Sequence, residues 1–511
     1  MQTATLATGS APATVPTAAL RSGGALSITG QGIKLIVQLG SLALMARLLS
    51  PADFGLYSLV APIAAFFLLF NDLGLTSATI YADNVTDREV TSLFWLSTAS
   101  GVVLGICLVG LAPLASAFYD EPRLTAVLST MALIFVCNGI GAQYRALLQR
   151  ELRFKALVTI EVGSVVLSTA LGLLAALYGL GYWSLIIAAI ALQAIDLIGC
   201  AVTSRWQPGR PTWEVRTAMM ARFGSSVAGF NILNYFARNL DNLLIGKVWG
   251  LSALGLYGRA YTLLMAPLSQ VIYPLNKVVV PVLTRINHDR STYVRTYERI
   301  LGVILLVCTP LVTWLLVARE AIVHVFLGPQ WHEVAPIFLS LGFAALVQPL
   351  NNSAGWLLLS QGRARDIFSS GVLSCAIAVT SFAIGLPWGA RGVATAYAIG
   401  QICAATPALW WLTCRGGRFP LAPVLATAVP VWIAAAVAGC SFHLVQTAFP
   451  MQGRLQQLAC AALWVSAAFV ATLTAMPSGR RLLRACLPTQ VLAAFRSASR
   501  TVQRPAPRSE E

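Results

Sequence analysis

The stretch NILNYFARNLDNLLIGKVWGLSALGLY, residues 231–257, repeats the polar design of SITGQGIKLIVQLGSLALMARLLSPADFGLY, residues 27–57. Each stretch is apolar except for polar residues that recur at steps of three and four, so each polar set falls on one face of a helix. Each predicted helix is followed by the same tripeptide, Gly-Leu-Tyr, at 55–57 and 255–257. A duplicated membrane domain with a polar stripe facing inward is typical of transporters that build a path between two halves.

The polar positions of the two stretches correspond at a constant offset: Gln31 with Asn231, Lys34 with Asn234, Gln38 with Arg238, and Ser41 with Asp241. Two of these residues, Lys34 and Arg238, lie near the middle of their predicted spans. A charge in the hydrocarbon costs about 2.5–3.5 kcal/mol, so such residues usually face a cavity or a partner. We therefore predict a cationic cavity lined by both, which suits an anionic cargo such as a phosphate or pyrophosphate.

Composition identifies an integral membrane protein. The chain has 511 residues, of which 57% are hydrophobic and 11% charged, with a mean hydropathy of +0.73. Soluble domains carry about 25% charged residues. Because the apolar runs are of helix length, the spans are helices rather than strands. We predict an all-α protein with about fourteen transmembrane helices: two six-helix lobes related by a pseudo-two-fold axis along the membrane normal, plus two C-terminal helices.

The predicted organisation has six parts along the chain. They are a disordered cytoplasmic N-terminus (1–21), an N-lobe (22–203), a cytoplasmic inter-lobe loop (204–218), a C-lobe (219–413), two additional spans (421–476) and a basic cytoplasmic tail (477–511).

The net charge of +16 reports topology rather than nucleic-acid binding. Most of the 35 lysines and arginines fall in loops on one side of the predicted membrane. This is the positive-inside pattern, and it places both termini in the cytoplasm. The Arg-rich tail is expected to associate with anionic membrane lipid.

For each of the other polar residues in the spans, two roles are open. Lys277 and Arg259 lie nearer the ends of their predicted span, so they either line the cavity or extend to the interface. Asn351 either donates hydrogen bonds to a sugar or joins two helices. Asp241 either pairs with Arg238 three residues before it or forms a proton or sodium site.

Further acids are candidates for ion coupling or for structure. Asp72 is the preferred coupling-ion residue. Asp53 follows Pro51, where it can cap the second helix or pair with Arg47 at the surface. Two more intramembrane acids, Glu161 and Asp196, are expected to pair with each other or to lie near an interface.

The chain offers no catalytic motif. A Walker lysine loop is absent, the four histidines are isolated, and the ten cysteines lack the spacing of metal ligands or disulfides. We therefore expect no catalytic residue, no cofactor and no metal.

Four motifs resemble the Wzx-type polysaccharide flippases, the polysaccharide transporter family of the multidrug/oligosaccharidyl-lipid/polysaccharide (MOP) exporter superfamily. They are MARLLSPADFGLY at 45–57, NILNYFARNLDNLLIG at 231–246, GLYGRAYTLLMAP at 255–267 and QPLNNSAGWLLLSQGR at 348–363. The resemblance spans nearly the whole chain apart from its two tails.

This resemblance implies a bacterial inner-membrane flippase for lipopolysaccharide or exopolysaccharide synthesis. Its cargo would be an undecaprenyl-pyrophosphate-linked oligosaccharide, moved from the cytoplasmic to the periplasmic leaflet by alternating access. The family's cavity cations would fall on Lys34 and Arg238, and its acidic helix-start position on Asp53. The expected partners are this cargo, membrane lipid, and the polymerase and chain-length proteins of the same pathway.

Two alternatives stay open at this point. An ion-coupled drug or cation antiporter of the same superfamily would want an acid-dominated cavity, which the basic stripes disfavour. A membrane polysaccharide polymerase or ligase would want a large outer loop, and the predicted outer loops are short.

Overall fold

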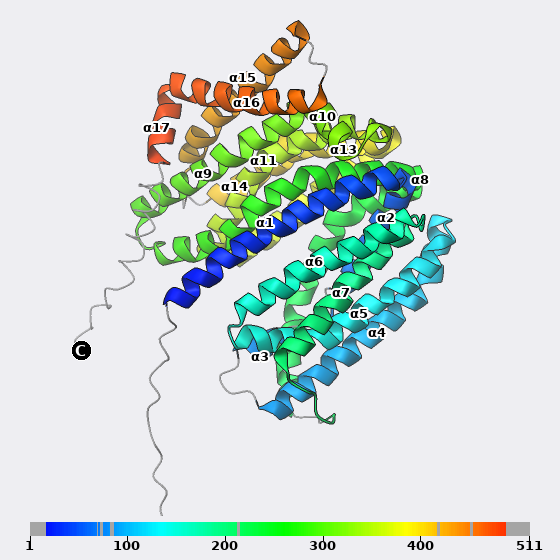
Figure 1. Ribbon diagram of the computed structural model, residues 1–511. Coiled ribbons are helices and arrows are strands. Elements are labelled where there is room, and N and C mark those ends of the chain that lie inside the picture. Colours follow the sequence, from blue (N-terminus) through cyan, green and yellow to red (C-terminus); the bar gives the residue numbers. More distant parts are fainter. Residues whose placement is uncertain are drawn as a thin grey trace, which may run out of the picture.

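The computed structural model describes the backbone of residues 17–68, 70–71, 75–81, 86–211, 215–415, 419–449 and 453–486. Within these ranges it describes the side chains except those of residues 17–29, 77–78, 81, 215–238 and 277. The described chain is helical, and Figure 1 shows two groups of long helices with a further pair outside them.

The first lobe, the N-lobe, surrounds a polar centre with long helices. Its elements are α1 (Thr17–Leu48), α2 (Pro51–Leu68), α3 (Leu75–Tyr81), α4 (Asp87–Tyr119), α5 (Arg123–Arg150), α6 (Phe154–Leu177) and α7 (Trp183–Ser204). The second predicted span is divided into α2 and α3. The first helix begins at Thr17, so it extends into the segment that we expected to be disordered.

The second lobe, the C-lobe, repeats this order. Its elements are α8 (Val215–Arg285), α9 (Arg290–Val317), α10 (Arg319–Phe326), η1 (Pro329–Trp331), α11 (Val334–Ser360), α12 (Ala364–Gly385), η2 (Leu386–Trp388), α13 (Gly389–Gly400), η3 (Gln401–Ala405) and α14 (Thr406–Cys414). Because α8 begins at Val215, the inter-lobe loop is shorter than predicted.

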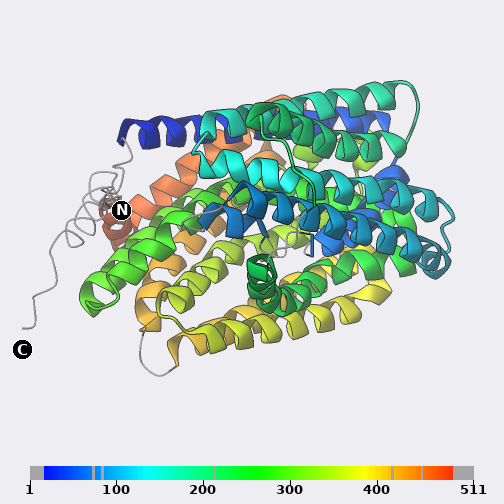
Figure 2. The ribbon, with the colours of Figure 1, turned by 90° about the horizontal axis from the view of Figure 1, so that it is seen from below.

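The last helices are α15 (Leu421–Ala448), α16 (Arg454–Ala475) and the short α17 (Pro477–Ala485). They lie on the side of the C-lobe away from the N-lobe (Figure 1). The views from the side and from below agree that the long helices run roughly alongside one another (Figure 2).

The predicted number of spans is confirmed within the described residues. Eleven helical segments of the described chain are long and apolar enough to cross a membrane, and the 32-residue α1, which is not among them, is long enough to make a further span. Two segments each supply two spans: α8 is broken at Gly250 (φ 77°, ψ −177°), and Ala364–Cys414 turns back at η2. The two six-helix lobes and the two additional C-terminal helices are therefore present.

The repeated Gly-Leu-Tyr motifs bring the lobes together. Gly55 in α2 and Gly255 in α8 pack against each other's helix so closely that a side chain cannot fit at either position. A Cβ on Gly55 would lie 1.8 Å from the Leu251 carbonyl oxygen, and a Cβ on Gly255 would lie 1.9 Å from that of Pro51. We call this end of the molecule, with the α1–α2 turn and the kink of α8, the closed end.

Hydrogen bonds and one ion pair reinforce the closed end. The side chains of Gln330 and Trp331 donate to the Ala46 carbonyl at 2.7 and 2.8 Å. Arg47 donates to the Val325 carbonyl at 3.0 Å. Lys247 of the C-lobe pairs with Asp120 of the N-lobe at 3.0 Å. These contacts hold α1 and the α4–α5 turn against the C-lobe.

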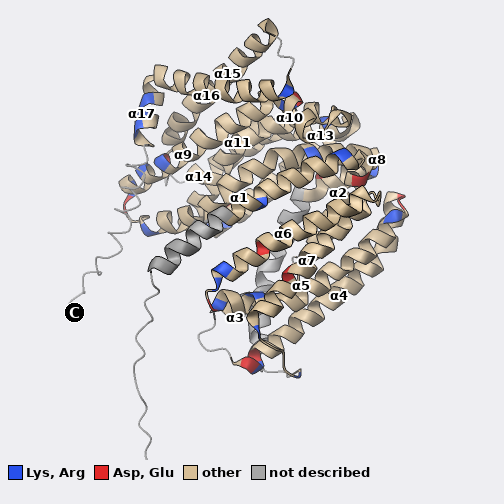
Figure 3. Ribbon diagram, in the orientation of Figure 1, with Lys and Arg blue, Asp and Glu red and all other residues tan. Residues whose placement is uncertain are grey.

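Most charged residues of the described chain lie near the two ends of the bundle. Figure 3 shows that most lysines, arginines and acids of the described chain gather near the helix ends, and that a few acids lie within the N-lobe. We call the end opposite the closed end the basic end, because it carries the arginines of the α5–α6, α8–α9 and α11–α12 turns and of α17. This distribution matches the predicted clustering of basic loops on one side.

Candidate functional site

A polar cavity of about 570 Å³ lies inside the N-lobe. Helices α1, α3, α5, α6 and α7 all contribute to its wall. Its polar lining consists of Lys34, Gln38, Thr76, Asn138, Arg145, Glu161, Ser164, Gln193 and Asp196. Amides, hydroxyls and charges of both signs therefore surround a space large enough for part of a polar ligand.

Two ion pairs lie in the wall of this cavity. Lys34 Nζ of α1 lies 2.8 Å from Glu161 Oε2 of α6. Arg145 of α5 pairs with Asp196 of α7. The expectation that Glu161 and Asp196 pair with each other is wrong, because each acid binds a separate cation on a different helix.

The charges of the described cavity wall cancel. It carries two cations and two carboxylates, so its formal charge is zero. The sequence predicted a cationic cavity from Lys34 and Arg238, but the side chain of Arg238 lies outside the described residues. Lys34 and Gln38 line this cavity, whereas Gln31 is exposed. Sequence reasoning did not identify Arg145 as a cavity residue.

Most of the matching C-lobe stripe cannot be placed in the same detail. The side chains of Asn231, Asn234 and Lys277 lie outside the described residues, as does Asp72 entirely. Asp241 is described: its side chain is buried and accepts a hydrogen bond from the Tyr257 hydroxyl at 2.8 Å. This bond links the two halves of α8 across the kink at Gly250.

Arg259 lies at the contact between the lobes. Its guanidinium stacks over the ring of Phe54 in α2, with 4.4 Å to the ring centroid. A buried guanidinium on an aromatic face gains cation–π attraction, worth up to about 2 kcal/mol when desolvated. Its Nε is buried without a hydrogen-bond partner among the described residues.

Asp53 takes part in the start of α2, but not as the capping residue that we predicted. Ser50 occupies the position before Pro51, and Asp53 lies at the third helical position. The carboxylate of Asp53 accepts from the Ser50 backbone N–H at 3.0 Å and from its hydroxyl at 2.6 Å. The Ser50 hydroxyl accepts from the Asp53 N–H in return. This reciprocal pair is a capping box, and Arg47 binds the Val325 carbonyl instead of Asp53.

Asn351 joins two helices. Its amide donates to the Thr406 hydroxyl of α14 at 2.9 Å, while its carbonyl oxygen is buried without a partner. This geometry favours the helix-joining reading over sugar binding.

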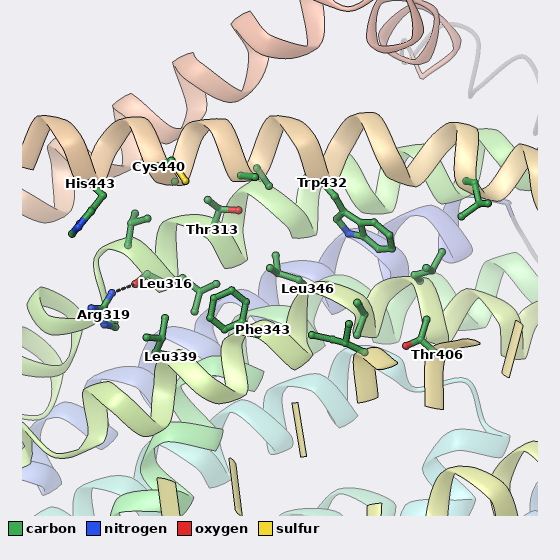
Figure 4. A pocket seen from close by; sticks show the side chains of 18 of the residues that line it. Thr313, Leu316, Arg319, Leu339, Phe343, Leu346, Thr406, Trp432, Cys440 and His443 are labelled. Atoms are coloured by element: carbon green, nitrogen blue, oxygen red, sulfur yellow. Dashed lines mark hydrogen bonds between the residues drawn. The ribbon is translucent and has the colours of Figure 1, made fainter. Parts of the chain in front are cut away.

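A second, apolar groove of about 1260 Å³ runs between the C-lobe and α15. Figure 4 shows Phe343, Leu346 and Trp432 turned into it, with Arg319 and His443 near one another towards one side. Trp410 and Trp411 of α14 line it as well. No motif of the sequence marked this groove. The only feature of the sequence that could have indicated it is the pair Trp410–Trp411 in α14. The partner helix α15 follows the two repeats and has no counterpart in them, so the repeats do not reveal the groove.

Comparisons with known proteins connect this architecture to surface-polysaccharide synthesis. The family model described as "Polysaccharide biosynthesis protein" matches residues 44–336, more than half of the chain. The teichuronic acid biosynthesis protein TuaB of Bacillus subtilis (strain 168) is 27% identical over 343 residues, covering 66% of this chain and 71% of that protein. The lipopolysaccharide biosynthesis protein WzxC of Escherichia coli (strain K12) is 25% identical, covering 72% and 76%.

A third relative is likewise named for polysaccharide biosynthesis, and two solved structures share the fold. The succinoglycan biosynthesis transport protein ExoT of Rhizobium meliloti (strain 1021) is 26% identical, covering 63% of this chain and 64% of that protein. The fold matches that of the lipid II flippase MurJ in an inward closed conformation, with a TM-score of 0.70, 12% identity and coverage of 89% and 98%. An inward-facing multidrug transporter of the MATE family and MOP superfamily matches with a TM-score of 0.55, 14% identity and coverage of 75% and 94%.

Proposed function

The chain belongs to the polysaccharide biosynthesis protein family, and we propose from this membership that it is a flippase for undecaprenyl-pyrophosphate-linked oligosaccharides. In this proposal it moves repeat units from the cytoplasmic to the periplasmic leaflet by alternating access, for exopolysaccharide or lipopolysaccharide synthesis. The protein would lie in the bacterial inner membrane with both termini in the cytoplasm. The polymerase and chain-length proteins of the pathway would take over its product.

The observation that carries the proposal is the pairing of two unlike cavities in one membrane protein. The N-lobe cavity offers Lys34 and Arg145 together with the amides of Gln38, Asn138 and Gln193. The C-lobe groove is mostly apolar, although charged residues such as Arg319, Glu320 and Arg415 also line it. A cargo with a phosphate-linked sugar head and a prenyl tail needs both environments, because each part would be costly in the other.

We assign the head group to the polar cavity and the prenyl tail to the apolar groove. The pyrophosphate would meet Lys34, together with Arg238 of the matching stripe, and the sugars would meet the amides. The groove beside α15 offers the tail a lined surface, as an alternative to lipid at a gap between the lobes. Rocking of the lobes about the closed end would then expose the head group to the other side.

The membrane potential can supply the driving force. One elementary charge crossing 100 mV is worth about 2.3 kcal/mol. A pyrophosphate with about two negative charges would therefore gain about 4–5 kcal/mol when it leaves an inside-negative cell. This proposal does not need a cofactor.

The test is flipping of a fluorescent undecaprenyl-pyrophosphate-oligosaccharide in proteoliposomes, with an inside-negative potential on or off. We expect the wild type to flip faster with the potential on, and Lys34→Ala and Arg238→Ala to lose at least about tenfold in rate. Arg454→Ala, at the first residue of α16, is the control and should keep its rate. Undiminished flipping by both variants would place the cargo elsewhere. Absence of flipping by the folded wild type would favour the small-molecule antiporter.

A further inference from the structure

We propose that Glu161 is a built-in stand-in for the anionic cargo: it neutralises Lys34 in the empty carrier and is displaced when a phosphate-type anion enters the N-lobe cavity. The inference rests on the proposed function for the identity of the anion. The role of Glu161 follows from the geometry of the two ion pairs.

The two pairs differ in which member is more exposed. In the first pair the Lys34 side chain is 17% exposed and the Glu161 side chain 38%. In the second pair Arg145 is 37% exposed and Asp196 is 15%. All four side chains line the cavity, but the more accessible member is the acid Glu161 in the first pair and the cation Arg145 in the second.

The cost of an uncompensated charge explains why a shield is needed. Lys34 is part-buried in a membrane-spanning lobe, and breaking a buried pair by removing one partner is strongly destabilising. A carrier that works by alternating access must also return without cargo. With Glu161 on Lys34, the described wall of the empty cavity is formally neutral, so this return needs no other anion.

An incoming phosphate-type anion can compete with Glu161. It carries more charge and more acceptor oxygens than one carboxylate, and charge-assisted hydrogen bonds strengthen accordingly. Arg145 offers the entering anion an open cation in the same cavity. The displaced carboxylate of Glu161 is already more than a third exposed, so it can turn towards the cavity with little loss of solvation. The exchange is of ion-pair partners only, and no covalent bond changes.

A purely structural pair would behave differently from a displaceable one. If the Lys34–Glu161 bond only holds α1 against α6 and the anion binds away from Lys34, removing the carboxylate lowers stability and changes anion affinity little. If Glu161 competes with the cargo, removing the carboxylate raises anion affinity, and the gain depends on Lys34. The two roles are therefore separable by binding, without any flipping assay.

The test is calorimetric titration of inorganic pyrophosphate into the purified full-length chain at pH 7.5 and low salt. Close charge pairs couple by about 1.5 kcal/mol or more, so we expect Glu161→Gln to bind at least about tenfold more tightly than wild type. The double variant Lys34→Gln/Glu161→Gln should lose this gain. Glu151→Gln is the matched control, because Glu151 forms an exposed pair with Arg153 in a turn, and it should bind like wild type.

Equal or weaker binding by a folded Glu161→Gln overturns the proposal, as does absence of binding by both wild type and variant. If Glu161→Gln does not fold, Glu161→Asp replaces it: its shorter side chain should shield Lys34 less well and give an intermediate gain. A gain in pyrophosphate affinity in a protein that flips no lipid-linked sugar would reject the proposed function while leaving the role of Glu161 intact.

Discussion

The hydrogen bond between Tyr257 and Asp241 joins the two halves of α8. The two residues lie on the two sides of the kink in α8, and their 2.8 Å bond joins the end of the polar stripe to the Gly-Leu-Tyr motif that follows it. The sequence predicted an ion pair between Asp241 and Arg238 or an ion site. Nothing in the spacing of residues 241 and 257 suggested that they meet, because the contact exists only after the helix bends back.

We predict that Tyr257→Phe lowers the free energy of unfolding by about 1–3 kcal/mol, because it leaves the buried Asp241 carboxylate without this donor. Thermal unfolding in detergent would measure the change. Tyr273→Phe is the control: Tyr273 is exposed, so its midpoint should match that of wild type. Equal midpoints for all three proteins would mean that another donor or water replaces the hydroxyl.

The ion pairs of the N-lobe cavity mark the limit of prediction at this scale. Lys34 was selected because a lysine in the middle of an apolar run needs a reason. Its partner Glu161 lies on α6, and single-sequence patterns carry no information on which helices will be neighbours. The apolar context therefore identified Lys34, Glu161 and Asp196 as unusual, while their pairing and the part played by Arg145 required the fold.

At the scale of elements, the start of α9 shows how a polar side chain stabilises a helix end. Asp289 precedes α9 and accepts hydrogen bonds from the backbone N–H groups of Ser291 and Thr292. The Thr292 and Ser291 side chains donate as well, and together these bonds hold the pKa of Asp289 at about 2, below its ordinary value of 3.8. An ionised carboxylate at the start of a helix is favoured by the exposed N–H groups and by the helix dipole.

We predict that this cap stabilises α9 above pH 4 and loses its effect as the pH falls through about 2. The sign follows from linkage: a carboxyl whose pKa is lower in the folded state adds stability wherever it is ionised in both states, and that contribution fades on acidification. Asp289→Ala should therefore lower the unfolding midpoint at pH 7 and change less than wild type between pH 4 and pH 2. Asp289→Asn is the control, because it keeps the capping oxygen but cannot titrate. If the unfolding midpoint of Asp289→Asn changed with pH as much as that of wild type, the prediction would be contradicted.

The close packing of α2 against α8 gives a second prediction for an element. A Cβ at Gly255 would lie 1.9 Å from the Pro51 carbonyl oxygen, so the two helices must separate to accept it. We expect Gly255→Ala to weaken the closed end by about 1–3 kcal/mol, the usual cost of overpacking.

Hydrogen exchange would detect this weakening as faster exchange of the backbone N–H groups at the starts of α2 and of the second half of α8. Gly110→Ala is the matched control, because a Cβ at Gly110 in α4 meets nothing within 4 Å. Unchanged exchange in Gly255→Ala would mean that the lobes accommodate the methyl group without opening.

At the scale of the whole molecule, the fold was largely predictable and the cavities were not. Apolar run lengths predicted the spans, the repeated motifs predicted two lobes in one orientation, and basic loops predicted that one end would carry the arginines. The apolar groove was missed because it forms between α15 and helices that are distant from it in sequence, including α9 and α11. In the sequence, its apolar lining residues cannot be told apart from the lipid-facing residues of any membrane helix, and only the packing of α15 beside them reveals the groove.

The groove makes the assignment of the prenyl tail testable with one pair of glycines. Gly439 of α15 lines the groove, and a Cβ there would touch only Thr313 and Val317 at ordinary contact distances of 3.6 and 3.7 Å. Gly439→Phe should therefore fill the groove without displacing the backbone. Gly110→Phe adds the same ring to an exposed face of α4 and serves as its matched control.

If the tail occupies the groove, Gly439→Phe should flip a cargo with the full undecaprenyl chain at least about tenfold more slowly, since burial of each methylene is worth about 0.8 kcal/mol and several would be lost. A cargo whose prenyl chain is too short to reach the groove should be flipped at similar rates by both glycine variants. Equal flipping of the long-chain cargo by both variants would show that the tail travels in lipid between the lobes, and that the groove serves another apolar occupant.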